Sequence, residues 1–209
     1  MSSEANNLDQ SSESEVALDE RDRADVARLV SGHDAALNNL MERHAGKLFN
    51  YLIRCLQNEE DAADAVQDTF VRVYQNRAKF DPGQRFATWL YAIATNLVKD
   101  RYRWCSRHPQ VSLDAVNEAT GGDFRENVPD QGASPHDALN VEERAQIVRR
   151  AVGALPEELR VPLFLSEYED LSHADVGAIL KCSAKAIETR LYRARQQLRI
   201  ALATLLGAP

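Results

Sequence analysis

The stretch from Leu171 to Leu198 constrains the fold most, because its pattern predicts two short helices separated by a break. Ser172 is a suitable N-cap for the first helix, and Asp175 follows three residues later to complete a capping-box pattern. The apolar residues of this helix then recur at helical spacing: Val176, Ile179 and Leu180.

The break is Lys181-Cys182-Ser183, and Ser183 can cap a second helix with one apolar and one polar face. The apolar stripe is Ile187, Leu191, Ala194 and Leu198, and the opposite face holds Lys185, Thr189, Tyr192, Arg193 and Gln196. Five cations here oppose one acid, Glu188, in a chain of formal charge -7: Lys185, Arg190, Arg193, Arg195 and Arg199. This pattern predicts a helix-turn-helix whose second helix lies in a DNA major groove. A surface hairpin with a solvated basic face is the alternative.

The overall composition limits the classes of function that the chain can serve. A pI near 5.3 argues against a protein that coats nucleic acid non-specifically, so DNA binding must come from local basic patches. No apolar run approaches the roughly 18 residues of a membrane span, which predicts no membrane insertion. The acidic, Ser-rich start is unlike a signal peptide, and three cysteines far apart fit a reducing cytoplasm without a structural metal.

The first 31 residues form an acidic extension, for which we expect disorder over about the first fifteen and a short helix over residues 19–30. A solubilising tail is the favoured interpretation. Residues 32–106 then carry three amphipathic helical patterns. The first opens near Gly32 and Asp34, the second near Glu59, and the third follows the turn signal Asp81-Pro82-Gly83.

Two of these helices carry surfaces that suit binding. In the second, Asp64, Gln67 and Asp68 extend past the first turn, either as solvated surface or as a docking face for a basic partner. The third interleaves aromatic, basic and amide residues, a combination that stacks on unpaired bases and holds phosphates. They are Arg85, Thr88, Trp89, Tyr91, Asn96, Lys99, Arg101, Tyr102, Arg103 and Trp104. For Trp89 or Trp104 alone, packing in the core is the stronger interpretation.

Residues 107–138 lose helical periodicity and are rich in Pro, Gly, Asp and Ser, which predicts a flexible linker before a second domain over residues 139–209. The fold class is therefore all-α, with two small helical domains. The five histidines form no metal-ligand spacing or catalytic triad, and no nucleotide-binding glycine loop is present. The sequence predicts no enzyme, no cofactor and no metal.

Three strings, in this order, resemble bacterial sigma factors of the extracytoplasmic-function (ECF) type: DAADAVQDTFVRVY, FATWLYAIATNLVKDRYR and ALPEELRVPLFLSEYEDLSHADVGAILKCSAKAIETRLYRARQQL. The resemblance covers about residues 33–106 and 139–204, and it implies a sigma region 2 bundle and a sigma region 4 helix-turn-helix. It implies a subunit that binds RNA polymerase core through β′ and β and directs promoter recognition, melting and initiation. The chain departs from the family at Lys181, where the turn often has Gly, so we expect a strained or differently shaped turn.

The resemblance also implies roles for named residues. It implies polymerase contacts at Asp61, Asp64, Gln67 and Asp68. It implies melting and single-strand capture at the minus-ten element by Phe86, Thr88, Trp89, Tyr91, Asn96, Lys99 and Arg103. It implies duplex reading at the minus-thirty-five element by Lys185, Glu188, Thr189, Arg190, Tyr192 and Arg193. Many members of this family are held inactive by an anti-sigma factor, which is an implied partner here.

Two other classes of function stay open at this point. A stand-alone helix-turn-helix regulator would use residues 33–106 for sensing or dimerisation, and it would bind a duplex operator without polymerase. A protein whose main task is to bind another protein is the third class.

Overall fold

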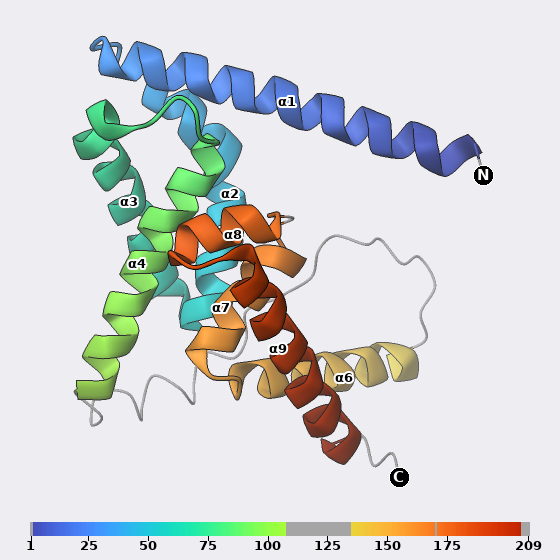
Figure 1. The fold of residues 1–209 in the computed structure, drawn as a ribbon. Helices are drawn as coiled ribbons and strands as arrows, with labels where there is room; N and C mark the ends of the chain where they lie inside the picture. Colours follow the sequence, from blue (N-terminus) through green and yellow to red (C-terminus); the bar gives the residue numbers. More distant parts are fainter. Residues whose placement is uncertain (1, 108–134, 170, 206–209) are drawn as a thin grey trace. The chain divides into compact units, whose positions relative to one another are not determined.

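The computed structural model describes residues 2–107, 135–169 and 171–205, and the predicted linker lies largely outside these ranges. The chain divides into two compact units, residues 1–115 and 116–209 (Figure 1). Within the described ranges every regular element is helical and no strand is present, which confirms the all-α prediction.

The first unit contains α1 (Ser2–Val30), α2 (Ala36–Leu56), α3 (Glu59–Asn76), the short 3-10 helix η1 (Arg77–Lys79) and α4 (Phe86–Arg107). Helices α2, α3 and α4 pack against one another because each carries an apolar stripe at the helical period. Apolar residues of these stripes form the centre of this core, with Leu40, Leu48, Leu52, Ala62, Phe70, Val73, Phe86 and Leu90 at 2% exposure or less.

A buried polar contact joins α2 to α4 inside this core. The hydroxyl groups of Tyr51 and Thr95, both fully buried, lie 2.8 Å apart. Burial, first of all, raises the pKa of Tyr51 well above its ordinary value, so the phenol stays neutral. Its ring also meets Tyr91 edge-on at 5.3 Å. These contacts fix how α2 and α4 face each other.

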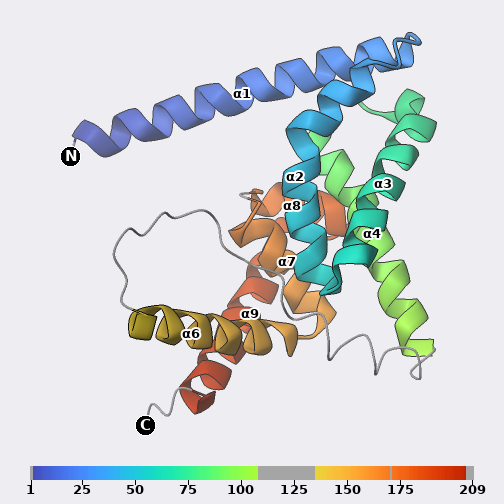
Figure 2. The same cartoon turned by 180° about the vertical axis from the view of Figure 1, so that it is seen from behind.

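The extension agrees with the prediction in part. The predicted helix over residues 19–30 is present, but α1 begins already at Ser2, where we expected disorder, and no glycine or proline interrupts the sequence up to Val30. Its C-terminal half is part of the first unit, because Val26 and Leu29 are buried at 2% and 0% exposure. Figures 1 and 2 show α1 lying across the end of the unit where α2 begins. A solubilising tail is therefore the wrong description of this half.

The second unit contains α6 (Pro135–Gly153), α7 (Glu157–Glu167), α8 (His173–Leu180) and α9 (Ala184–Leu205). Helix α9 contacts the other three, and its predicted stripe is buried at Ile187, Leu191 and Ala194, while Leu198 is only half-buried. Figure 2 shows α6 beside α9. The core of this unit also takes Leu159, Phe164 and Leu165 from α7.

Candidate nucleic-acid and polymerase interfaces

The α8–α9 hairpin has the local structure that its sequence predicts. Asp175 N–H donates to the Ser172 Oγ at 3.1 Å, and the Ser172 hydroxyl donates to the Asp175 carboxylate at 2.6 Å. Ser183 caps α9 by accepting from the Ala186 N–H at 3.2 Å. Lys181 adopts the left-handed conformation, with φ 55° and ψ 47°, where glycine is usual. The predicted cap and the predicted departure at Lys181 are both confirmed.

Gly177 explains how closely α8 approaches the turn. The Cys182 N–H donates to the Gly177 carbonyl at 2.9 Å, which folds the turn back onto the helix. A Cβ atom at position 177 would lie 2.7 Å from the Cys182 carbonyl oxygen, which is backbone. Only glycine therefore fits here without a shift of the turn.

The outer face of α9 carries the predicted duplex readers. Lys185, Glu188, Thr189, Tyr192 and Arg193 are exposed, and Tyr192 reaches 63%. Lys185 Nζ lies 2.7 Å from the Glu188 carboxylate, and this hydrogen bond is the main cause of the lowered pKa of Glu188. These five side chains can all reach a ligand outside the protein.

Arg190, the sixth predicted reader, is half-buried. Its Nη1 lies 3.8 Å from the Cys182 Sγ, so the guanidinium is turned toward the turn rather than extended from the outer face of α9. Its predicted contact with DNA stays a prediction.

A hollow of about 220 Å³ in the first unit lies between α3, η1 and α4. Its lining is polar and cationic with one large ring: Arg72, Asn76, Lys79, Trp89, Ile93 and Asn96. Lys79 Nζ donates to the Asn76 side-chain oxygen at 3.0 Å, and the Asn76 amide donates to the Arg72 carbonyl at 2.9 Å. This half-open hollow, which we call the α3–α4 pocket, combines one indole ring with cationic and amide side chains.

Sequence reasoning found only part of this pocket. Trp89 and Asn96 were predicted to contact single-stranded DNA, and both line it. Arg72, Asn76 and Lys79 were missed, although their spacing of four and then three residues places them on one helical face. That spacing, just before the Asp81-Pro82-Gly83 turn, is the signal that could have found them.

Three residues predicted to contact the minus-ten strand are core residues instead. Phe86 is fully buried, and Thr88 and Tyr91 are each 5% exposed. Phe86 and Tyr91 pack against His44 and Tyr51 of α2, because α4 contacts α1, α2 and α3 and buries a wide arc of its surface. Burial leaves these three side chains no free surface for a DNA strand, so we correct their prediction as direct DNA contacts.

The other minus-ten residues lie toward the end of α4. Asn96 and Arg103 are exposed and Lys99 is half-buried, and Arg103 forms a 3.1 Å ion pair with Asp100 one turn away. Trp104, which packing would bury, is 40% exposed, with the Arg101 guanidinium 4.9 Å from its ring centre. This end of α4 can meet a polyanion.

The predicted polymerase face lies on α3. Asp64, Gln67 and Asp68 are exposed, and Val71, one turn later on the same side, is 51% exposed. Asp61 differs, because both of its carboxylate oxygens accept from Arg101 Nη2, at 2.8 and 2.7 Å. Asp61 therefore ties α3 to α4, and its predicted polymerase contact stays a prediction.

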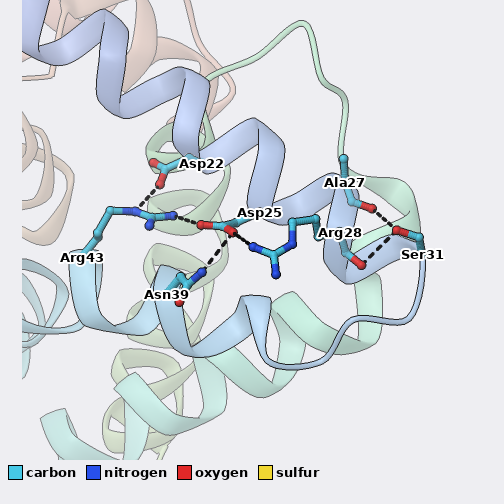
Figure 3. A network of polar contacts seen from close by, with 7 residues as sticks. All are labelled: Asp22, Asp25, Ala27, Arg28, Ser31, Asn39 and Arg43. Atoms are coloured by element: carbon cyan, nitrogen blue, oxygen red, sulfur yellow. Dashed lines mark hydrogen bonds and ion pairs between the residues drawn. The ribbon is translucent and has the colours of Figure 1, made fainter.

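A network of buried charges joins α1 to α2, and sequence reasoning missed it (Figure 3). Arg43 bridges two carboxylates of α1, at 2.9 Å to Asp22 and 2.6 Å to Asp25. Asn39 also donates to Asp25, at 3.1 Å. Burial disfavours the charge on Asp25, but the hydrogen bonds from Arg43 and Asn39 outweigh it and lower the pKa of this carboxyl. The network anchors α1 on α2.

The parts of the chain that the structure describes contain no cluster of residues suited to a metal ion, and none of their helices could span a bilayer. Sequence comparison gives matches to both units. Residues 40–107 match Sigma-70 region 2, and residues 145–198 match Sigma-70, region 4.

Individual relatives and solved structures agree with these matches. The ECF RNA polymerase sigma-E factor of Escherichia coli (strain K12) is 32% identical over 179 residues, 84% of this chain and 91% of the relative. The ECF RNA polymerase sigma factor SigW of Bacillus subtilis (strain 168) is 31% identical over 175 residues, which cover 83% of this chain and 92% of the relative. CnrH, solved with the cytosolic domain of CnrY, has a TM-score of 0.64 and 28% identity over 88% of this chain and 98% of that one.

The sigma factor RpoE from Bartonella quintana, solved with the anti-sigma factor NepR, has a TM-score of 0.59 and 25% identity over 79% of this chain and 95% of that chain. Two sigma regions thus match in chain order, and two curated relatives match more than four-fifths of this chain. The chain belongs to the ECF RNA polymerase sigma factors.

Proposed function

We propose that this protein is a dissociable subunit that binds RNA polymerase core and gives it promoter specificity. The observation that carries this proposal is the presence, in one chain, of a hollow lined by Trp89 with cationic and amide side chains, and of a helix-turn-helix with an exposed basic face. The hollow suits an unstacked base. A stand-alone regulator needs only the second of these. As a polymerase subunit, the protein acts in the cytoplasm, and it catalyses no reaction itself.

Each of three surfaces binds a different partner: the polymerase core, the upstream duplex element or the melted downstream element. The exposed face of α3, with Asp64, Gln67 and Asp68, docks on the polymerase core. The outer face of α9 reads the upstream element as a duplex, with Arg suited to guanine edges and Glu to cytosine. The α3–α4 pocket takes one base of the downstream element after melting, with Trp89 for stacking and Asn96 for hydrogen bonding.

The pocket has a chemical preference that follows from its donors. Arg72 and Lys79 are cationic, and Asn76 has its side-chain oxygen occupied by Lys79. A base that presents acceptor atoms, or the adjacent phosphate, matches such a lining better than a base edge rich in donors. Cations also favour the single strand through its phosphates, and this part of the affinity falls with added salt.

An anti-sigma factor is the proposed regulator. RpoE of Bartonella quintana was solved with the anti-sigma factor NepR, and CnrH was solved with the cytosolic domain of CnrY. An inhibitor that covers the exposed α3 face or the α9 face would block polymerase or promoter binding.

Reconstitution tests the proposal. Purified protein is mixed with bacterial RNA polymerase core, and transcripts are mapped on genomic DNA of the source organism. We expect a stable complex and initiation at a limited set of promoters. The proposal fails if no promoter-dependent transcript forms while the free protein binds a duplex operator tightly, since that result identifies a stand-alone regulator.

Two substitutions separate the surfaces. Asp64→Arg reverses the charge of an exposed α3 residue, so we expect loss of core binding with the fold intact. Arg193→Ala removes an exposed cation of α9, so we expect about 1–3 kcal/mol weaker recognition of the upstream element with core binding unchanged. Equal promoter activity of both variants and wild type would overturn these assignments.

A further inference from the structure

Two acids of α1 reach the start of α4, one directly and one through a side chain of α2. Asp19 Oδ2 forms an ion pair, not a hydrogen bond, with Arg85 Nε at 2.9 Å, and Arg85 is the residue before the helix. Asp22 Oδ2 lies 2.7 Å from His44 Nε2, and the His44 ring packs against Phe86, the first residue of α4, at 5.1 Å between centroids. These acids are one helical turn apart, so α1 holds the start of α4 at two consecutive residues.

This start of α4 is also one wall of the α3–α4 pocket. Phe80, Phe86 and Trp89 form a cluster of rings, with centroids 5.2 Å apart for Phe80 and Trp89 and 6.1 Å apart for Phe86 and Trp89. Trp89 lines the pocket. An unbroken series of packed groups therefore runs from Asp22 through His44 and Phe86 to the pocket wall.

The groups in this series have little freedom to move. Asp22 is 1% exposed, His44 6% and Phe86 0%. Closely packed interiors transmit small displacements, because no void absorbs them. The turn over residues 80–85 is closed by short-range bonds, such as Gln84 N–H to the Asp81 carbonyl at 3.0 Å, and its Phe80 packs on Phe86 and Trp89. The first turn of α4 is thus held both by this turn and by contacts from α1 and α2.

We propose that Asp19 and Asp22 of α1 are positioning residues for the α3–α4 pocket. Through Arg85, and through His44 and Phe86, they hold Trp89 in the orientation in which it receives an unstacked base. The acidic extension then has a defined task in promoter opening, although it does not touch DNA. This inference rests on the proposed function of the pocket.

Asp25 provides a matched control on the same helix. It is also an acid of α1, buried at 6% exposure, and it also binds Arg43. In the described residues, Asp25 bonds to Arg28, Asn39 and Arg43, and not to His44 or Arg85. Asp25→Asn should therefore weaken the anchoring of α1 as Asp22→Asn does, while leaving the contacts to the start of α4 in place.

The first readout is the environment of Trp89 in the free, full-length protein. Trp89 and Trp104 are the two tryptophans of the chain, so Trp104→Phe serves as the common background that isolates Trp89 emission. Acrylamide quenching and the emission maximum are compared for Asp19→Asn, Asp22→Asn and Asp25→Asn. We expect both to change in the first two variants and to match the background protein in the third.

The second readout is holoenzyme binding to a promoter found by the reconstitution above, used fully paired and with the downstream element already opened as a mismatched bubble. We expect Asp19→Asn and Asp22→Asn to weaken binding to the opened template by about twofold to thirtyfold, the range for mutations that act on a site through intervening packed groups. Asp25→Asn should lower the unfolding temperature without this loss. Core binding should be equal in all variants.

The double variant Asp22→Asn/His44→Gln tests whether Asp22 acts through His44. If it does, the double variant binds the opened template no more weakly than whichever of Asp22→Asn and His44→Gln binds it less tightly. Asp19→Asn keeps the experiment decisive if Asp22→Asn unfolds, because Asp19 and Arg85 are partly exposed.

The positioning role is overturned if Trp89 quenching is unchanged in Asp19→Asn and Asp22→Asn, or if Asp25→Asn changes it equally, since α1 would then be a general support. A failure of the proposed function looks different. In that case the wild-type holoenzyme would show no preference for the opened template, while the quenching of Trp89 in the free protein would still decide the role of α1.

Discussion

Gly177→Ala gives a sharp test of the helix-turn-helix, because the effect of one added methyl group can be worked out from the structure. In an open helix interior, replacing Gly by Ala stabilises by roughly 0.5–1 kcal/mol, since the unfolded chain loses freedom. At position 177 the new Cβ would lie 2.7 Å from the Cys182 carbonyl oxygen and 3.4 Å from the Ala184 nitrogen. Both are backbone atoms, so the turn itself must move.

Overpacking of a closely packed site costs about 1–3 kcal/mol, which exceeds the helix-propensity gain. We therefore expect a net loss of up to about 2.5 kcal/mol in the second unit, combining these two contributions. For a domain of 60–100 residues each kcal/mol shifts the unfolding temperature by about 4–8 °C. The displaced turn should also tilt α9 and weaken binding to the upstream duplex element.

Gly46→Ala is the matched control. Gly46 lies inside α2, and an added Cβ there meets nothing within 4 Å. The same substitution should therefore stabilise the first unit by about 0.5–1 kcal/mol. Hydrogen exchange on the full-length protein assigns each change to its unit, and holoenzyme binding to duplex DNA measures the effect on α9. If Gly177→Ala were as stable as wild type and bound duplex equally, the close approach of α8 to the turn would be refuted.

Two further predictions concern backbone strain and acid pH. Lys181→Gly should stabilise the second unit by about 0.5 kcal/mol, because relief of the left-handed strain at φ 55° exceeds the entropic cost of glycine; calorimetry showing a loss would contradict this. Asp25 has a lowered pKa in the folded chain, so its stabilisation is present above its ordinary value of 3.8 and is lost as the pH falls through the folded value. The stability difference between wild type and Asp25→Asn should therefore shrink below about pH 4, and urea unfolding across pH 3–6 measures it.

The elements that could be predicted from sequence are those that local rules determine. Ser172, Ser183 and Lys181 behave as predicted, since caps and left-handed turns depend on residues within one turn of the chain. The apolar stripes of α2, α3 and α9 follow equally from the helical period. Family resemblance then supplied the functions of surfaces that periodicity leaves undecided.

The errors on α4 have a physical cause. Residue type alone does not say which way a side chain faces, and Phe86, Thr88 and Tyr91 share a helix with exposed residues of similar chemistry. A helix packed on one neighbour buries a narrow stripe, whereas α4 contacts both α2 and α3 and buries a wider arc. The number of neighbours is a tertiary property. It could not be read from the α4 sequence by itself.

The two acidic helices show where a sequence argument could have gone further. On α3, Asp64 and Asp68 lie outside the stripe of Ala62, Phe70 and Val73, and they are exposed. On α1, Asp22 precedes Val26 by four residues and Leu29 by seven, so it lies within the buried stripe.

An acid within an apolar stripe must find a hydrogen-bonded or charged partner, because an isolated buried carboxylate is too costly. The register of Asp22 therefore predicts a cation on the neighbouring helix, and Arg43 of α2 is that cation. Both helices are acidic, so their charge does not distinguish them. The position of each acid relative to the apolar stripe does: acids outside the stripe form an exposed surface that can dock a partner, and an acid within the stripe anchors the helix. By this criterion the extension is part of the first unit's structure.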